Sequence, residues 1–225
     1  MRESALREFY DREYHFTEDI DRPNPDRLWR ALRELEPLEN LQLLDLGCGV
    51  GWAMAVATER GRVGRAVGLD FSQRALDLGM RRAAQEWPAA ARLRVSWVCG
   101  DGIRLPFADA SFDRAFSFGS MEHFPDVRAG FGELARVLRP GGLAVTVVPN
   151  FYVRTAQPVE HRDTESGWRR IIDASGLEVL RVGADRGPAI LKNPHPHRIA
   201  LRLGLRLLGA VPALRYQFIF VLRKS

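Results

Sequence analysis

The sequence has few cysteines and no long apolar run, and each shortage excludes a class of protein. No apolar stretch in the 225 residues approaches the roughly 20 needed to cross a bilayer. Arg2 and Glu3 are charged and no apolar run follows Met1, so we expect no secretory signal there and a cytoplasmic protein. The two cysteines, Cys48 and Cys99, fall in or beside expected buried strands, which favours free thiols in a reducing compartment over a disulfide.

Lysine is also almost absent. Lys192 and Lys224 are the only two, and every other member of the Lys+Arg total of 33 is arginine. The formal net charge is +5, but the arginines are spread along the chain among 28 acidic residues. We therefore favour a solvated surface over a nucleic-acid-binding face. Hydrophobic residues make up 46% of the sequence, which is enough for the core of one globular domain.

From residue 41 onward, apolar runs alternate with stretches of helical periodicity. This pattern is typical of a doubly wound α/β fold, a mostly parallel sheet with helices on both faces. The expected strands are 41–46, 65–70, 94–99, 112–118, 143–149, 177–183 and 216–223. The expected helices between them are 51–60, 72–87, 126–138 and 164–175, of which the last three begin at Ser72, Asp126 and Thr164 as N-caps.

Two segments lie outside this alternation. Residues 1–40 hold two helical stretches, at about 3–15 and 25–35, which we interpret as an N-terminal lid or extension of the domain at 41–225. Residues 192–212 carry arginines and leucines at helical spacing and predict a basic amphipathic insert. Such a helix could lie on an anionic membrane or line an acceptor pocket, but we favour a leucine face on the sheet with arginines in water.

The most informative motif runs from Leu43 to Gly51 and reads as a buried strand entering a G-x-G-x-G turn. Glycines let the backbone turn sharply and let a ligand lie against bare main chain. Asp45, two residues before Gly47, would repel a pyrophosphate and attract an ammonium or sulfonium. The motif favours a cationic cofactor without phosphate, although an ordinary strand–turn–helix with a capping Asp shares the pattern.

Two more acids follow the next two expected strands. Asp70 lies 19 residues past the last glycine of the turn, the separation typical of a carboxylate that accepts both hydroxyls of a ribose. Asp101 could accept from an exocyclic adenine amine, with Phe71 and Ile103 as walls around the ring, although an Asp between two glycines is often a turn residue. Three acids at successive strand ends meet in the crevice where open α/β sheets bind ligands.

On these residues the chain resembles the class I, Rossmann-like S-adenosylmethionine-dependent methyltransferases, specifically the small-molecule branch called type 11. The resemblance covers about residues 41–183 and extends more loosely to 225. It is carried by Leu43–Trp52, Asp70, Asp101–Ile103, Leu105–Phe107, Ser111–Asp113, Met121–Asp126 and Leu138–Gly142. It implies a seven-stranded sheet in the order 3-2-1-4-5-7-6 with strand seven antiparallel. It also implies transfer of the sulfonium methyl, by in-line displacement, to an oxygen, nitrogen or carbon of a small molecule.

The motifs and the resemblance together give the expected cofactor site. Phe118, at the end of strand four, is expected on the sulfur side, and Tyr14, together with Tyr10, is expected to close over the cofactor. No metal site is expected, because His195 and His197 have no acid or cysteine beside them. The full set of expected S-adenosylmethionine-binding residues is Asp45, Gly47, Gly49, Asp70, Phe71, Asp101, Gly102, Ile103, Phe118 and Tyr14.

His123 is the candidate catalytic residue. It follows strand four at the rim of the crevice, and a general base is needed only when the nucleophile carries a proton. The alternative is a positional residue that hydrogen-bonds the backbone or the cofactor carboxylate, and we give it more weight because the family often carries His here without needing a base. His15 and His161 are weaker candidates.

Three rival functions share parts of this pattern. A nicotinamide-dependent dehydrogenase would have G-x-G-x-x-G, whereas Trp52 follows Gly51 here, and it would have no use for Asp45. A nucleic-acid methyltransferase would present an Asn/Asp-Pro-Pro-aromatic motif where this chain has Ser117–Ser120, so nucleic acid is not an expected partner. A non-catalytic interaction module would not require the acids.

Overall fold

The computed structural model describes residues 3–13, 24–152, 158–185 and 216–225. The strands are β1 Gln42–Leu46, β2 Arg65–Asp70, β3 Val95–Cys99, β4 Phe112–Phe118, β5 Leu138–Pro149, β6 Leu177–Asp185 and β7 Gln217–Lys224. The α-helices are α1 Glu3–Glu13, α2 Pro25–Leu32, α3 Trp52–Glu59, α4 Gln73–Glu86, α5 Ala89–Arg92, α6 Val127–Val137 and α7 Glu165–Asp173. Two 3₁₀ turns complete the described elements, η1 Arg33–Leu35 and η2 Met121–His123.

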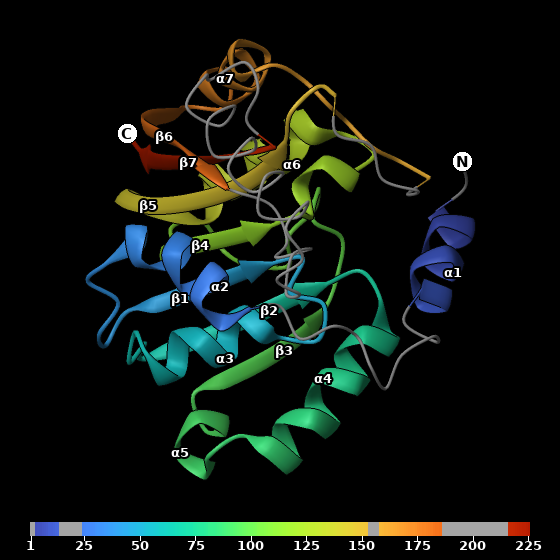
Figure 1. The fold of residues 1–225 in the computed structure, drawn as a ribbon, viewed down its shortest axis with the longest axis vertical. Helices are drawn as coiled ribbons and strands as arrows, with labels where there is room; N and C mark the ends of the chain where they lie inside the picture. The colour runs from blue at the N-terminus through green and yellow to red at the C-terminus, as the bar shows by residue number, and fades with distance from the viewer. Residues whose placement is uncertain (1–2, 14–23, 153–157, 186–215) are drawn as a thin grey trace, which may run out of the picture.

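The strands form one seven-stranded sheet in the order β3-β2-β1-β4-β5-β7-β6 (Figure 1). Strands β1 to β5 pair in parallel, and β7 is antiparallel to both β5 and β6. This confirms the predicted fold class and strand order. In the register, Asp45 lies opposite Gly68 of β2 and Phe116 of β4, so the carboxyl ends of these strands meet at one edge.

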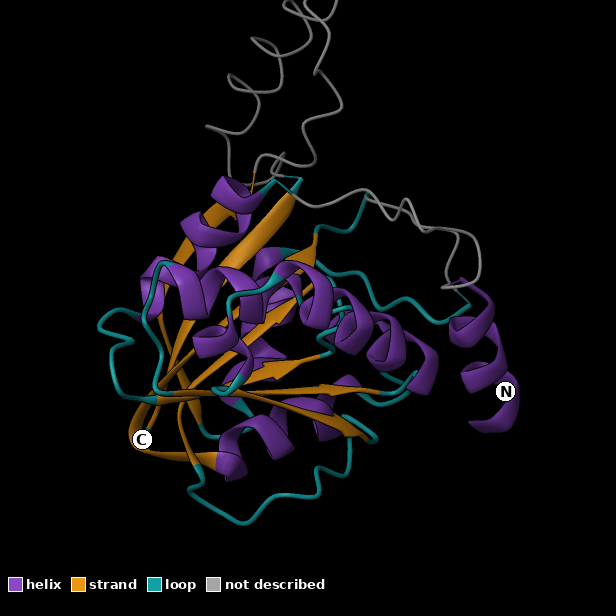
Figure 2. Cartoon of the chain, turned by 90° about the horizontal axis from the view of Figure 1, so that it is seen from below, coloured by secondary structure: helices purple, strands orange, loops and turns teal. Residues whose placement is uncertain are grey.

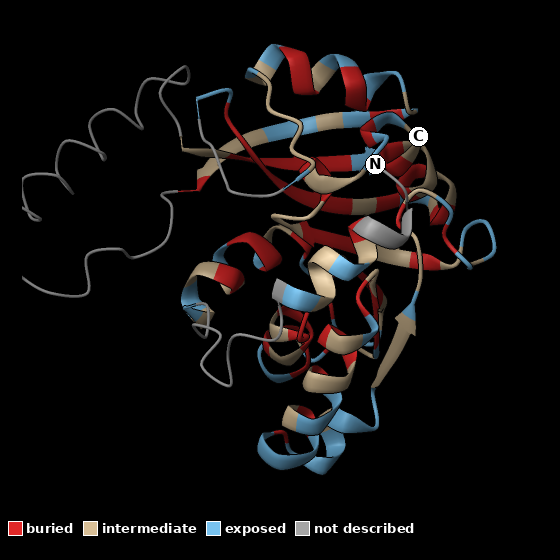
Figure 3. Cartoon of the chain, turned by 90° about the vertical axis from the view of Figure 1, so that its right-hand side faces the viewer, coloured by how far each residue is buried: buried red, intermediate tan, exposed pale blue. Residues whose placement is uncertain are grey.

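Helices cover both faces of the sheet (Figure 2), and the buried residues concentrate between the layers (Figure 3). On one face, α2, α3 and α4 bury Leu32, Met54 and Leu76 against the strands. On the other, α6 and α7 bury Phe131 and Trp168. Because both faces are covered, the central strands β1 and β2 are buried along most of their length.

The predicted N-caps are confirmed. Ser72, Asp126 and Thr164 each accept a hydrogen bond from the backbone N–H three residues later, at 3.1, 3.0 and 3.2 Å. Helix α3 differs, because it follows Gly51 in the left-handed region and has no side-chain cap among the described residues. Its N-terminus therefore meets the glycine-rich turn without a capping side chain, and the Met54 N–H in its first turn hydrogen-bonds the Asp45 carboxyl.

Two elements differ from the sequence-based expectation. Strand β5 begins at Leu138, not at residue 143, because Leu138 pairs with Phe112 before the register shifts at the Pro-Gly-Gly segment. Helix α5 was not predicted. It begins directly after Pro88, whose carbonyl accepts from the N–H groups of Ala91 and Arg92 at 2.9 and 3.1 Å.

Some expectations fall on residues outside the described ranges. These are Tyr14, His15, the insert at 192–212, and with it His195 and His197. In the parts of the chain that are described, no helix is long and apolar enough to cross a membrane.

Candidate functional site

The turn after β1 has a backbone shape that requires glycine. Gly47, Gly49 and Gly51 have φ angles of +74°, +53° and +80°. A Cβ on Gly47 would lie 2.3 Å from the Cβ of Ser120, and one on Gly51 would lie 2.2 Å from the indole of Trp97. The Gly47 N–H donates to the Leu69 carbonyl at 2.8 Å. The turn is therefore hydrogen-bonded to β2 and packed against the loop after β4. A fixed main chain of this kind could hold a ligand.

Asp70 joins this turn to α4. Its Oδ2 accepts from the Gly49 N–H at 2.7 Å, and its Oδ1 accepts from the Ser72 N–H at 2.9 Å. Burial raises the pKa of the Asp70 carboxyl, and these N–H groups oppose the rise. Each carboxylate oxygen has a second lone pair, so the fixed carboxylate can also accept the two hydroxyls of a ribose.

Asp45 is buried in β1, with 2% of its surface exposed. Its Oδ2 has no hydrogen-bond partner among the described residues. Burial, and then the charge of Asp70, raise the Asp45 pKa to about 8. An unsatisfied buried carboxyl oxygen beside bare main chain fits a cationic group such as a sulfonium or ammonium, which would draw the carboxyl into its ionised form.

Asp101 lies in the turn after β3 and stabilises it. Its Oδ1 accepts from the Ile103 N–H at 3.0 Å, and its Oδ2 pairs with Arg104 at 3.2 Å. A Cβ on Gly102 would lie 2.3 Å from the Phe124 ring. The turn-residue interpretation of Asp101 thus holds, and the remaining lone pairs leave an adenine contact possible in addition.

Helix α1 stands beyond the carboxyl ends of the central strands (Figure 1). The Arg7 guanidinium lies 4.1 Å from the centroid of the Phe71 ring and donates to the Phe71 carbonyl at 2.7 Å. The Ser72 hydroxyl donates to Asp11, and the Tyr10 ring lies 6.5 Å from the His123 ring. The helix therefore spans the crevice from the β2 side to the β4 side. Sequence reasoning missed Arg7 and Asp11, because nothing in their spacing marks these long-range contacts.

The segment after β4 places His123 at the same edge. Its Nδ1 lies 2.8 Å from the Val159 carbonyl, and burial lowers its pKa. A carbonyl can only accept, so Nδ1 carries the proton and the lone pair is on Nε2. The Ser120 hydroxyl donates to the Gly47 carbonyl at 3.0 Å, which ties this segment to the glycine-rich turn. His161 lies nearby, and its backbone N–H donates to the backbone carbonyl of Glu122 at 2.7 Å.

Glu122 is a buried acid that sequence reasoning missed. It is 3% exposed, and its Oε2 has no hydrogen-bond partner in the described ranges. Its Oε1 lies 3.9 Å from Nε2 of His123. Burial, followed by the charge of Glu160, raises the Glu122 pKa to about 8. Its position beside the candidate histidine was the available signal.

The two acids with strongly raised pKa values predict a pH-dependent stability. The pKa values of Asp45 and Glu122 are about 8 in the folded chain, well above their ordinary values near 4. The folded state therefore holds more protons than the unfolded state between those values, so the free energy of unfolding falls as pH rises through that range. We expect the melting temperature to fall between about pH 7 and pH 9.

This window avoids His123, whose lowered pKa acts with the opposite sign below its ordinary value near 6.5. Asp45→Asn and Glu122→Gln should each flatten the slope. Glu133→Gln is the matched control, because the pKa of Glu133 is lowered and lies outside the window. An unchanged slope in the Asp45→Asn/Glu122→Gln double variant would contradict this account of the two acids.

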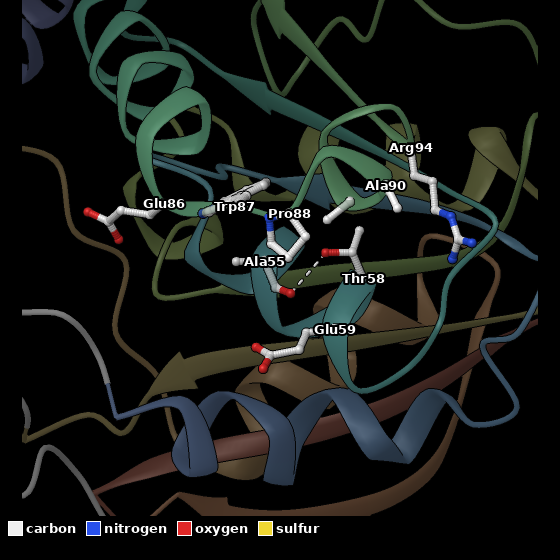
Figure 4. Close-up of a pocket in the computed structure, with 9 residues that line it drawn as sticks. Ala55, Thr58, Glu59, Glu86, Trp87, Pro88, Ala90 and Arg94 are labelled. Carbon is white, nitrogen blue, oxygen red and sulfur yellow. Dashed lines mark hydrogen bonds between the residues drawn. The ribbon is translucent and has the colours of Figure 1, made fainter.

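A separate pocket lies between α3 and the α4–α5 segment (Figure 4). Ala55, Thr58 and Glu59 contribute from α3, and Trp87 and Arg94 contribute from the other side. Arg94 precedes β3, so this pocket is at the amino end of that strand. The acids and glycines described above lie at the opposite, carboxyl ends and do not line it.

Comparison with known proteins gives concordant matches. Residues 44–146 match the Methyltransf_11 family model, described as a methyltransferase domain. A demethylmenaquinone methyltransferase of Corynebacterium kroppenstedtii is 37% identical over 58% of this chain and 52% of its own length. A 24-methylenesterol C-methyltransferase 2 of Oryza sativa subsp. japonica is 35% identical over 62% of this chain and 42% of its own. The chain thus spans about half the length of these curated relatives.

Among solved structures, a geranyl diphosphate methyltransferase in complex with SAM superposes with a TM-score of 0.68 at 19% identity, over 89% of this chain and 85% of that chain. Identity this low shows the fold alone. The described chain has the fold of the class I, Rossmann-like methyltransferases. Within that fold, residues 44–146 are the part that matches the type 11 methyltransferase domain model. The family-model match supports the predicted family, and the geranyl diphosphate methyltransferase binds S-adenosylmethionine, the cofactor predicted for this chain.

Proposed function

We propose that this protein transfers the methyl group of S-adenosylmethionine to a small-molecule acceptor. The observation that carries the proposal is the row of carboxylates at Asp45, Asp70 and Asp101. They lie at or just after the carboxyl ends of three adjacent strands, next to a turn whose glycines have positive φ angles. When bound, the cofactor supplies an activated methyl group on a sulfonium.

The chain's own residues then have distinct roles. Asp70 accepts from the ribose, and Asp101, with Phe71 and Ile103, borders the adenine. Gly47 and Gly49 offer bare main chain, and Asp45 provides a negative charge opposite the sulfonium. Gly102 lets the turn approach closely, and Phe118 closes the sulfur side. Helix α1, held by Arg7 and Asp11, excludes water from this edge of the sheet.

For the acceptor we propose a small molecule with an oxygen, nitrogen or carbon nucleophile, in line with the sulfonium methyl. The names of two relatives, a demethylmenaquinone and a sterol methyltransferase, support a hydrophobic acceptor of this kind. Residues 1–40 are proposed as an extension that completes the domain at 41–225, since α2 packs Leu28 and Leu32 into its core.

For a hydroxyl acceptor, His123 is the proposed base at Nε2, since its Nδ1 proton is committed to the Val159 carbonyl. His123→Asn keeps an amide donor for that carbonyl and removes the basic nitrogen. We expect turnover of a hydroxyl acceptor to fall about 10²- to 10⁴-fold, with unchanged affinity for S-adenosylhomocysteine. Parallel binding and turnover assays test this, with His161→Asn as the matched control. Normal turnover would exclude a base, and a loss of affinity would favour the positional role.

The proposal is tested by transfer of label from methyl-tritiated S-adenosylmethionine to a panel containing a hydroquinone, a sterol and a short RNA. We expect label on an organic-soluble small molecule and none on RNA. Label on RNA that falls steeply with salt would overturn the acceptor class in favour of nucleic acid. Cofactor binding without label on any member of a broad small-molecule library would favour an interaction module.

A further inference from the structure

Arg27 lies in the first turn of α2, and only two of its three guanidinium nitrogens, Nε and Nη2, have hydrogen-bond partners among the described residues. Its Nε lies 3.2 and 3.0 Å from the two carboxylate oxygens of Asp185, and its Nη2 donates to Asp185 Oδ2 and, at 3.0 Å, to Gln217 Oε1. Nη1 makes no hydrogen bond with any residue that the structure describes. Because Nε and Nη2 are both fixed, the direction of the remaining donor is fixed as well.

The guanidinium lies at the carboxyl end of β4. Its central carbon is 4.7 Å from the centroid of the Phe118 ring. Asp45 pairs with Phe116, so Gly47, two residues further on, is level with Phe118 on the neighbouring strand. Ser120 then bonds the Gly47 carbonyl at 3.0 Å. Arg27 therefore places a cation over the end of β4, the strand that neighbours β1 and its glycine-rich turn on the side away from β2.

The order of the strands indicates which part of the cofactor would lie near Arg27. Strands β3, β2, β1 and β4 lie side by side in that order. In the proposed function, Asp101 just after β3 faces the adenine, Asp70 of β2 faces the ribose, and Asp45 of β1 faces the sulfonium. The remaining part of the cofactor is its amino-acid tail, and the next strand in the row is β4.

We propose that Arg27 binds the carboxylate of this amino-acid tail through Nη1, and that Asp185 and Gln217 are its positioning residues. The inference rests on the proposed cofactor site. A charge-assisted hydrogen bond from a guanidinium is among the stronger polar contacts a carboxylate can make. Arg27 is on α2, Asp185 ends β6 and Gln217 begins β7, so all three lie outside the family match at 44–146. The cofactor site would thus include both ends of the chain.

Two probes isolate the carboxylate: S-adenosylhomocysteine and its decarboxylated analogue, which keeps the amine. In calorimetric titrations of the wild-type chain, we expect S-adenosylhomocysteine to bind at least about 10-fold more tightly. The double variant Arg27→Gln/Asp185→Asn leaves no unpaired buried charge. It should lose about 10- to 100-fold in affinity for S-adenosylhomocysteine and bind the analogue as the wild type does.

Equal affinities of the wild type for the two probes would overturn the proposal without any variant. An equal loss of affinity for both probes in the double variant would also overturn it, because a purely structural role of Arg27 would have that effect. Failure of the wild type to bind either probe would instead contradict the cofactor site itself. Arg30→Gln, an exposed arginine on the same helix, is the matched control and should bind both probes normally.

A folding defect in the double variant would show in its thermal melt. In that case Arg27→Lys provides the test, because an ammonium can still pair with Asp185 but carries no second guanidinium nitrogen. Its preference for S-adenosylhomocysteine over the analogue should then fall toward unity. A wild-type preference in this variant would overturn the assignment to Nη1.

Discussion

Gly47→Ala is expected to lower the affinity for S-adenosylhomocysteine by at least about 100-fold. Two costs combine at this residue. An alanine at φ +74° is strained by about 1 to 2 kcal/mol. Its Cβ would also lie 2.3 and 2.4 Å from the Cβ and Oγ of Ser120, so the turn or the β4 loop must move. Either movement displaces the main chain against which the cofactor is proposed to lie. Titration calorimetry and a thermal melt measure both consequences.

The chain offers a control for each cost. Gly141 has the same φ of +74°, and a Cβ there would meet nothing within 4 Å. Gly141→Ala should therefore lose some stability through strain alone and keep its affinity. Ser120→Gly removes the atoms that clash, so the Gly47→Ala/Ser120→Gly double variant should recover part of the affinity. Comparable affinity losses in Gly47→Ala and Gly141→Ala would mean that the close packing of Gly47 against Ser120 is not needed for ligand binding.

Asp70→Asn is expected to weaken S-adenosylhomocysteine binding by about 100-fold or more, because it removes a charged acceptor proposed for the ribose. It also disturbs the turn, since one carboxylate accepts from both Gly49 and Ser72. An amide has only one accepting oxygen, so one of these N–H groups loses its partner. Asp77→Asn, at a partly exposed acid on α4, is the charge-matched control.

The same variant has a second readout. The charge of Asp70 helps to raise the Asp45 pKa, so Asp70→Asn should lower that pKa and shift the pH dependence of stability toward lower pH. Unchanged ligand affinity in Asp70→Asn would remove this residue from the cofactor site, whatever happened to the pH dependence.

Local patterns in the sequence predicted much of the fold and site. Strand alternation, the caps Ser72, Asp126 and Thr164, and the glycines of the turn depend on neighbours within a few residues, and these features were recovered. The early start of β5 was missed because it depends on pairing with Phe112 across the sheet.

The contacts that complete the candidate site could not be predicted in this way. Arg27 and Asp185 are 158 residues apart, and Arg7 and Phe71 are 64 apart. No periodicity or motif links such pairs, and only the folded sheet brings them together. The burial of Glu122 has a similar origin, because a charged residue in a short turn is ordinarily exposed.

We propose that the row of acids and the glycine-rich turn bind S-adenosylmethionine. Calorimetric titration of the full chain with S-adenosylhomocysteine, with NADH as the parallel control, tests it most directly. We expect micromolar binding of S-adenosylhomocysteine and no binding of NADH, because Trp52 occupies the position of the third glycine in the dinucleotide motif G-x-G-x-x-G. Binding of NADH, or a folded chain that does not bind S-adenosylhomocysteine, would contradict it.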